Sequence, residues 1–228
     1  MRVALYQMRD RKDVRLNINT AFFKITSTKA DFFCLPEYFP IPSDYKNSKT
    51  VEDAWVEISL PTIEMLKEAS TKFKGYIIGG SIVEKDEGKY YNTCFVFKDG
   101  EVIAKYRKMN LVDDEVRLDL SRGENTVSIE TEFGRVGILI CADCLDNNIV
   151  EKVAKKNDII FLPISLTDPS HPKVEGHPVS ERIARQYNVM VVKVSRIINN
   201  IGVKSAVVTP KTIYEAKSFG EELLVVNL

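Results

Sequence analysis

Three residues that could do chemistry stand at or near the ends of apolar or strand-like runs. Cys141 ends the run that starts at Val136, Glu37 ends the run that starts at Phe32, and Lys108 follows the strand-like segment 101–105. A thiol, a carboxylate and an ammonium that converge on one point would form an acyl-transfer site. The sequence therefore predicts that these three side chains meet in space, although they lie far apart along the chain.

Each residue type suits one step of that chemistry. A cysteine thiol is mostly protonated at neutral pH and needs a base to become a strong nucleophile. Burial disfavours the charged form of Glu37, which raises its pKa toward the range useful for proton transfer. The ammonium of Lys108 and the backbone N–H of Ala142 could stabilise an oxyanion together. These roles predict formation and hydrolysis of a thioester on Cys141.

The elements that must position these residues follow from the hydrophobic pattern. Apolar runs alternate with segments of helical period, which is typical of an α/β protein, and we predict one domain over residues 1–228. Strands are expected at 2–7, 31–35, 76–83, 91–97, 102–106, 159–164 and 189–194, and a terminal strand pair at 205–208 and 223–226. Helices are expected over 13–29, from Pro61 to Lys74, after a cap at Asp146 or Asn147, and around Ile183. The charged segment 109–126 is expected to be a functional loop.

Composition narrows the class of partner and the compartment. The chain has 32 basic and 32 acidic residues, so it lacks the positive charge expected of a protein that binds nucleic acid or a membrane surface. A small-molecule partner is favoured. No apolar stretch reaches the length of a membrane span, and the N-terminus does not read as a signal segment. Together with four cysteines that look like reduced thiols, this predicts a cytoplasmic protein.

Three motifs carry a family resemblance. Leu35-Pro36-Glu37, Tyr106-Arg107-Lys108 and the segment 137–143, which contains Cys141, resemble the motifs of the nitrilase superfamily, the carbon-nitrogen hydrolases, in order and in spacing. The resemblance extends over nearly the whole chain. It implies a four-layer αββα sandwich in which Glu37 is the general base and acid, Lys108 the oxyanion stabiliser and Cys141 the nucleophile. It also implies catalysis without a cofactor or metal, and a homodimer or higher homo-oligomer.

The same resemblance implies a second glutamate in the loop after the lysine. Glu115 is the best candidate, with Asp113 and Asp114 as alternatives. The sequence departs from the family pattern at Ala142, where an aromatic residue is common, and at 144–147, which lack the usual Arg-Phe-Pro-Glu. Substrate choice therefore stays open among a small amide, a carbamoyl compound and a nitrile, with an amide favoured.

Four other interpretations compete with this one. Cys141 and Cys144 have the spacing of a thioredoxin-like disulfide oxidoreductase, but that leaves Glu37 and Lys108 unexplained. Cys141, Cys144, His171 and His177 could bind zinc, although the histidine spacing is unusual. Cys141 with His177 could form a papain-like dyad, for which the sequence identifies no supporting residue. The fold could also serve as a catalytically silent binding module.

Overall fold

The strands of this protein form one curled sheet with two halves. The computed structural model describes residues 1–45, 49–166 and 174–228, and no helix within them is long and apolar enough to cross a membrane. The strand path runs through β4 (Ile82–Asp86), β5 (Lys89–Lys98), β3 (Tyr76–Ile78), β2 (Phe32–Cys34) and β1 (Arg2–Arg9). It continues through β10 (Met190–Ile197), β9 (Ile159–Ile164), β8 (Gly134–Ile138) and β7 (Ser128–Thr131). The halves join where β1 pairs with β10 in parallel, with Met8 opposite Arg196 and Arg9 opposite Ile197.

The first half consists of the β4-to-β1 path with β6 paired to β5 and β13 paired to β1. Its strands are β1 (Arg2–Arg9), β2 (Phe32–Cys34), β3 (Tyr76–Ile78), β4 (Ile82–Asp86), β5 (Lys89–Lys98), β6 (Glu101–Arg107) and β13 (Glu222–Asn227). The second half consists of the β10-to-β7 path with β11 on β10 and β12 on β11. Its strands are β7 (Ser128–Thr131), β8 (Gly134–Ile138), β9 (Ile159–Ile164), β10 (Met190–Ile197), β11 (Ala206–Val208) and β12 (Ile213–Glu215).

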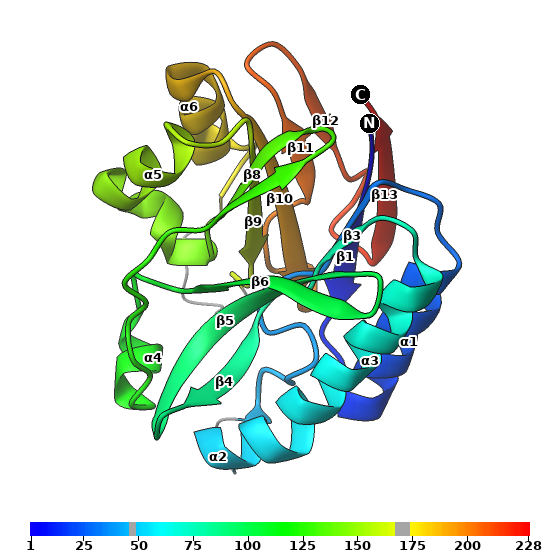
Figure 1. The fold of residues 1–228 in the computed structure, drawn as a ribbon, viewed down its shortest axis with the longest axis vertical. Coiled ribbons are helices and arrows are strands. Elements are labelled where there is room, and N and C mark those ends of the chain that lie inside the picture. The colour runs from blue at the N-terminus through cyan, green and yellow to red at the C-terminus, as the bar shows by residue number, and fades with distance from the viewer. Residues whose placement is uncertain (46–48, 167–173) are drawn as a thin grey trace.

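Helices cover the outer face of each half (Figure 1). On the first half lie α1 (Val14–Thr26) and α3 (Leu60–Lys72), which continues from α2 (Val51–Asp53) through a π-helical segment at Ala54–Ser59. On the second half lie α5 (Asn147–Ala154) and α6 (Pro178–Tyr187), and the short α4 (Asp113–Arg117) lies beside the β4–β5 end of the sheet. The carboxylate of Asp146 caps α5 by accepting the N–H groups of Asn148 and Ile149, as the sequence predicted.

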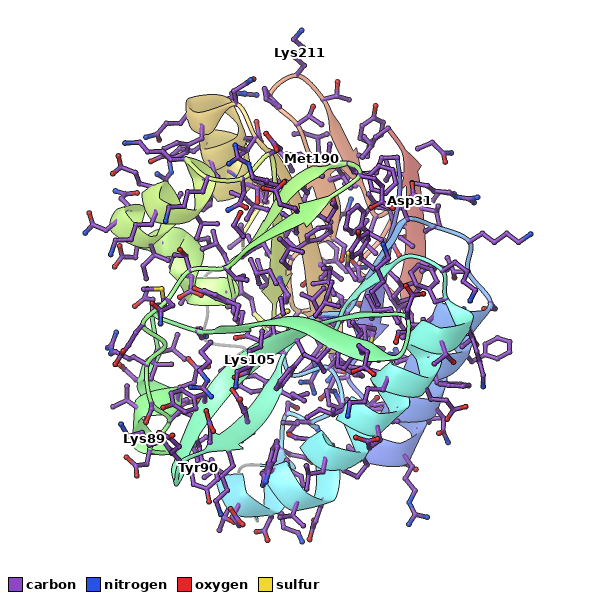
Figure 2. The ribbon with its side chains drawn as sticks, in the orientation of Figure 1. Asp31, Lys89, Tyr90, Lys105, Met190 and Lys211 are labelled. Atoms are coloured by element: carbon purple, nitrogen blue, oxygen red, sulfur yellow. The ribbon has the colours of Figure 1, made fainter. Side chains whose placement is uncertain are left out.

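Two apolar cores hold these layers together, and Figure 2 shows the side chains that fill the space between them. Between the sheet halves, Phe32 of β2 packs against Phe161 of β9 with ring centroids 5.1 Å apart. Between the first half and its helices, Phe33 packs with Ala21 of α1 and Leu66 of α3. Adjacent strand residues thus face opposite cores. The predicted four-layer αββα sandwich is confirmed.

Two strand predictions were wrong. The run 76–83 is two strands, because the chain turns at Gly79-Gly80; Gly80 has φ +64°, and a Cβ there would lie 2.2 Å from the carbonyl oxygen of Pro36. The segments 205–208 and 223–226 do not pair with each other. β11 pairs with β10 and β12, whereas β13 pairs antiparallel with β1. Pairing between chain ends leaves no local signal in the sequence.

Candidate active site

The residues that the sequence singled out meet at one edge of the sheet. Glu37 lies in the turn after β2, Lys108 directly follows β6, and Cys141 follows β8 and opens a 3₁₀ helix at Cys141–Leu145. Glu115 comes from α4, in the segment predicted as a functional loop. That segment is tied back to β5 by the Ser121 N–H, which donates to the Tyr90 carbonyl at the strand end labelled in Figure 2 (2.6 Å).

Lys108 joins the two glutamates. Its Nζ donates to Glu37 Oε1 at 2.9 Å and lies 2.8 Å from Glu115 Oε2, and all three side chains are at most 5% exposed. Asn92 Nδ2 also donates to both carboxylates, to Glu37 Oε1 at 3.0 Å and to Glu115 Oε1 at 2.7 Å. Buried charges need such partners, because unpaired charges are strongly disfavoured away from water.

Cys141 lies beside this cluster in a strained backbone conformation. Its φ is +45°, in the left-handed region that non-glycine residues seldom adopt, and its side chain is largely buried. Its thiol is close enough to Glu37 to lower the pKa of that carboxyl through a hydrogen bond. Ala142 follows in the first turn of the 3₁₀ helix, where backbone N–H groups lack partners within the helix.

Burial is the largest single influence on the pKa values of Glu37, Cys141 and Lys108. Burial raises the pKa of Glu37, and the neighbouring Lys108 ammonium offsets part of that rise. Burial also raises the pKa of the Cys141 thiol, and the Glu37 charge adds to that effect. For Lys108, burial opposes the charged form, but the charges of Glu37, Cys141 and Glu115 outweigh burial and raise its pKa. At neutral pH the resting site therefore holds a thiol next to an ammonium.

Asp143 ties the Cys141 segment to the Lys108 segment. Its carboxylate accepts the N–H groups of Met109 at 3.1 Å and Asn110 at 2.7 Å, both directly after Lys108. It also accepts the Ile140 N–H at 2.9 Å, directly before Cys141, and the Tyr106 hydroxyl at 2.8 Å. Burial raises the pKa of Asp143 to about 6, and the backbone N–H groups of Ile140 and Asn110 oppose that rise.

A second set of contacts fixes the turn that carries Glu37. Tyr38 has φ +50°, its hydroxyl donates to Glu115 Oε1 at 2.9 Å, and its carbonyl accepts from Arg196 Nη1 at 2.8 Å. Arg196 is itself buried and pairs with Asp10. The turn that carries Glu37 is thus held by contacts with helix α4 and strand β10.

The structure separates the competing candidates. Of the three acids after Lys108, Glu115 is the one within ion-pair distance of Lys108, whereas Asp113 is exposed and Asp114 pairs with Arg117 at the surface. His177 Nε2 lies 3.0 Å from Glu215, and its Nδ1 has no partner among the described residues, so neither ring nitrogen is bonded to Cys141.

The structure gives no support to the zinc site or to the thioredoxin-like redox pair considered above. His171 lies outside the described residues, and within the described part of the chain no group of three His, Cys, Asp or Glu side chains is arranged to hold a metal ion. Cys141 and Cys144 are free thiols.

Sequence reasoning missed several residues that complete this site. Asn92 lies inside a strand, where one polar residue gives no signal of its own. Tyr38 and Arg196 contact each other and residues far away in the sequence, and no local pattern predicts such contacts. Asp143 lies within the motif that contains Cys141. An acidic residue at the third position of a helix often accepts the N–H of the residue that precedes the helix, and this spacing from Ile140 is the signal that could have identified Asp143.

Known proteins share this sequence pattern and this fold. The family model described as carbon-nitrogen hydrolase matches residues 2–226. The chain is similar to the human omega-amidase NIT2, with 35% identity over 154 residues that cover 62% of this chain and 55% of that protein. It is equally similar to the chloroplastic omega-amidase of Arabidopsis thaliana, with 35% identity over 158 residues that cover 62% of this chain and 42% of that protein.

A solved structure extends the comparison over the full chain. Nit3 of Saccharomyces cerevisiae, a member of branch 10 of the nitrilase superfamily, superposes with a TM-score of 0.82 and 27% identity, covering 99% of this chain and 89% of that one. By contrast, the matched region spans about half the length of the first curated relatives.

Proposed function

The chain belongs to the carbon-nitrogen hydrolase family, and on that premise we propose that it hydrolyses a non-peptide carbon-nitrogen bond through a thioester on Cys141. One observation carries the proposal: the thiol, the Glu37 carboxylate and the Lys108 ammonium lie together in a buried cluster, with Lys108 Nζ 2.9 Å from Glu37 Oε1. Such a cluster supplies a nucleophile, a base and an oxyanion partner at one point.

The first half of the reaction forms the thioester. Glu37 takes the thiol proton as Cys141 Sγ attacks the carbonyl carbon, and the carbonyl oxygen becomes an oxyanion held by Lys108 and the Ala142 N–H. Glu37 then gives that proton to the departing nitrogen. Collapse of the intermediate breaks the carbon-nitrogen bond and releases ammonia or an amine.

The second half returns the enzyme to its resting state. Glu37 takes a proton from water, and the resulting hydroxide attacks the thioester carbon. Collapse of this second intermediate expels the Cys141 thiolate, which recovers its proton from Glu37. Glu115 contacts Lys108 and is proposed to hold the ammonium in place throughout.

A small amide or carbamoyl compound is the proposed substrate. Two of the relatives are omega-amidases, and this supports an amide over a nitrile. We also propose that the protein works in the cytoplasm, where its four free thiols would stay reduced, and as a homodimer. Sedimentation velocity of the purified protein tests the assembly, because a single monomer peak would contradict the dimer.

Ammonia release across short-chain amides, dicarboxylic monoamides and carbamoyl amino acids tests the activity. We expect Cys141→Ala to abolish turnover and the matched Cys144→Ala to keep most of it. The reverse result would favour the redox reading, and no ammonia from any substrate would favour a silent binding module. Mass spectrometry of a Glu37→Gln variant incubated with substrate should locate the acyl adduct on Cys141, and an adduct on Cys34, Cys94 or Cys144 would overturn the assignment.

A further inference from the structure

Asn92 is hydrogen-bonded to both glutamates of the site and to the backbone of Lys108. Its side chain is fully buried on β5, and Nδ2 donates to Glu37 Oε1 at 3.0 Å and to Glu115 Oε1 at 2.7 Å. Its backbone carbonyl accepts the Lys108 N–H at 2.8 Å. One residue therefore links both carboxylates and the lysine backbone.

The orientation of the Asn92 amide follows from this environment. Rotating the amide would place Oδ1 against two carboxylates, which offer no hydrogen to it, so the nitrogen must face them. As a result Oδ1 is buried and has no hydrogen-bond partner within the described part of the chain. A buried acceptor without a partner is unfavourable, and an apolar side chain of similar size would avoid it. The donor must therefore serve a purpose beyond packing.

The two carboxylate oxygens of Glu37 have different hydrogen-bond partners. Oε1 accepts from both Lys108 and Asn92, whereas Oε2 accepts the Ser165 N–H at 2.9 Å. The same Ser165 N–H acts on Cys141, where it lowers the pKa of the thiol. Oε2 is thus the Glu37 oxygen that shares the Ser165 N–H with the Cys141 thiol, whereas Oε1 is taken up by Lys108 and Asn92.

We propose that Asn92 is a positioning residue that fixes Glu37 Oε1 so that Oε2 receives the Cys141 proton. The proposal rests on the proposed function, because it assigns Glu37 as the base. A donor to a carboxylate favours the charged form, so loss of Asn92 makes Glu37 protonate at higher pH. It also frees the carboxyl to rotate away from the thiol.

Two variants test this in a folded protein. Asn92→Leu keeps the branched shape of the side chain without a donor, and Asn92→Ser keeps a polar group that is too short to bridge two carboxylates. The probe is iodoacetamide, with the alkylation rate of Cys141 followed by peptide mass spectrometry across pH. The acid limb of this rate should move up by about one pH unit, which makes alkylation about tenfold slower below the limb. With an amide substrate, kcat should fall in the same way while KM changes little.

Thr93→Val provides the matched control. Thr93 is the next residue of β5 and donates to a different buried carboxylate, Glu84 Oε2, at 2.8 Å. It should leave the alkylation limb of Cys141 in place. An unchanged limb in folded Asn92→Leu or Asn92→Ser, or an equal movement in Thr93→Val, would overturn the proposal. Failure of the proposed function is a separate result, because it appears as absent amide turnover in the wild type, whereas alkylation needs no substrate.

Discussion

Replacing Asp143 by asparagine should separate the activity of this protein from its stability. In the variant, Oδ1 can still accept the N–H groups of Met109 and Asn110, and the Tyr106 hydroxyl can turn to accept from Nδ2. The Ile140 N–H loses its acceptor, because Nδ2 has no lone pair to offer. An unsatisfied buried N–H costs about 1–3 kcal/mol.

The lost charge offsets that cost. Burial raises the pKa of Asp143 from 3.8 to about 6, so the folded protein disfavours its charged form by about 3 kcal/mol, and asparagine removes this penalty. At pH 7 the two effects nearly cancel. Because the folded state binds the Asp143 proton more tightly than the unfolded state does, wild-type stability from this group falls as pH rises from about 4 to 6. Relative to wild type, Asp143→Asn should therefore gain up to about 3 kcal/mol between pH 4 and pH 7.

The Asp143→Asn substitution should also lower the catalytic activity. Asp143 directly links Ile140, which precedes Cys141, to the residues that follow Lys108. Without the Ile140 bond the thiol can shift relative to the ammonium, and a displacement on the order of 1 Å lowers turnover about 10²-fold. Urea unfolding at several pH values measures the first effect, and ammonia release measures the second. A folded Asp143→Asn protein with wild-type kcat would refute the positioning argument, and a stability difference independent of pH would refute the electrostatic one.

Three further substitutions probe the site and its support. Lys108→Met leaves two buried carboxylates without their cation, so kcat/KM should fall at least about 10²-fold and the free energy of unfolding by about 3–5 kcal/mol. Turnover and urea unfolding measure the two effects, and retained turnover would exclude Lys108 as the oxyanion partner. Glu115→Gln should lower kcat about 10-fold or more, whereas Asp114→Asn at the surface should not, and equal effects would contradict the assignment of Glu115. Gly80→Ala must hold φ +64° with its Cβ 2.2 Å from a backbone oxygen, so its free energy of unfolding should fall by more than about 1 kcal/mol. The control Gly88→Ala has φ +78° but open space around its Cβ, so it should destabilise the fold less, and equal melting temperatures for the two variants would contradict this.

The sequence predicted the parts of the site that stand at strand ends. Glu37, Lys108 and Cys141 each follow an apolar or strand-like run, and such runs become strands whose ends meet at one edge of a layered sheet. The structure brings all three together. Glu115 could be narrowed only to three neighbouring acids, because a charged loop has no periodicity, and the choice depends on which side chain of α4 turns inward.

Other features depend on contacts between distant segments. Asn92 stands in a strand among aromatic and hydroxyl residues, and nothing local indicates that its amide meets two carboxylates from other elements. The pairing of β13 with β1 joins the two chain ends, so no short-range pattern specifies it. The break at Gly79-Gly80 did carry a signal, since two adjacent glycines favour a turn over a continuous strand.

The groups around Cys141 account for how a thiol with a raised pKa would act as the proposed nucleophile. Glu37 and Glu115 both contact the one ammonium of Lys108, so a free thiolate would bring a further negative charge into a buried place where two acids already share one cation. Burial is the main reason that the pKa of the Cys141 thiol is raised; the Glu37 charge adds to the rise, and the Lys108 ammonium opposes it. Transfer of the proton from Cys141 to Glu37 avoids that cost, because it moves a negative charge within the cluster without creating a new one. Deprotonation should therefore occur together with attack on the substrate, with Lys108 close to the charge both before and after the transfer.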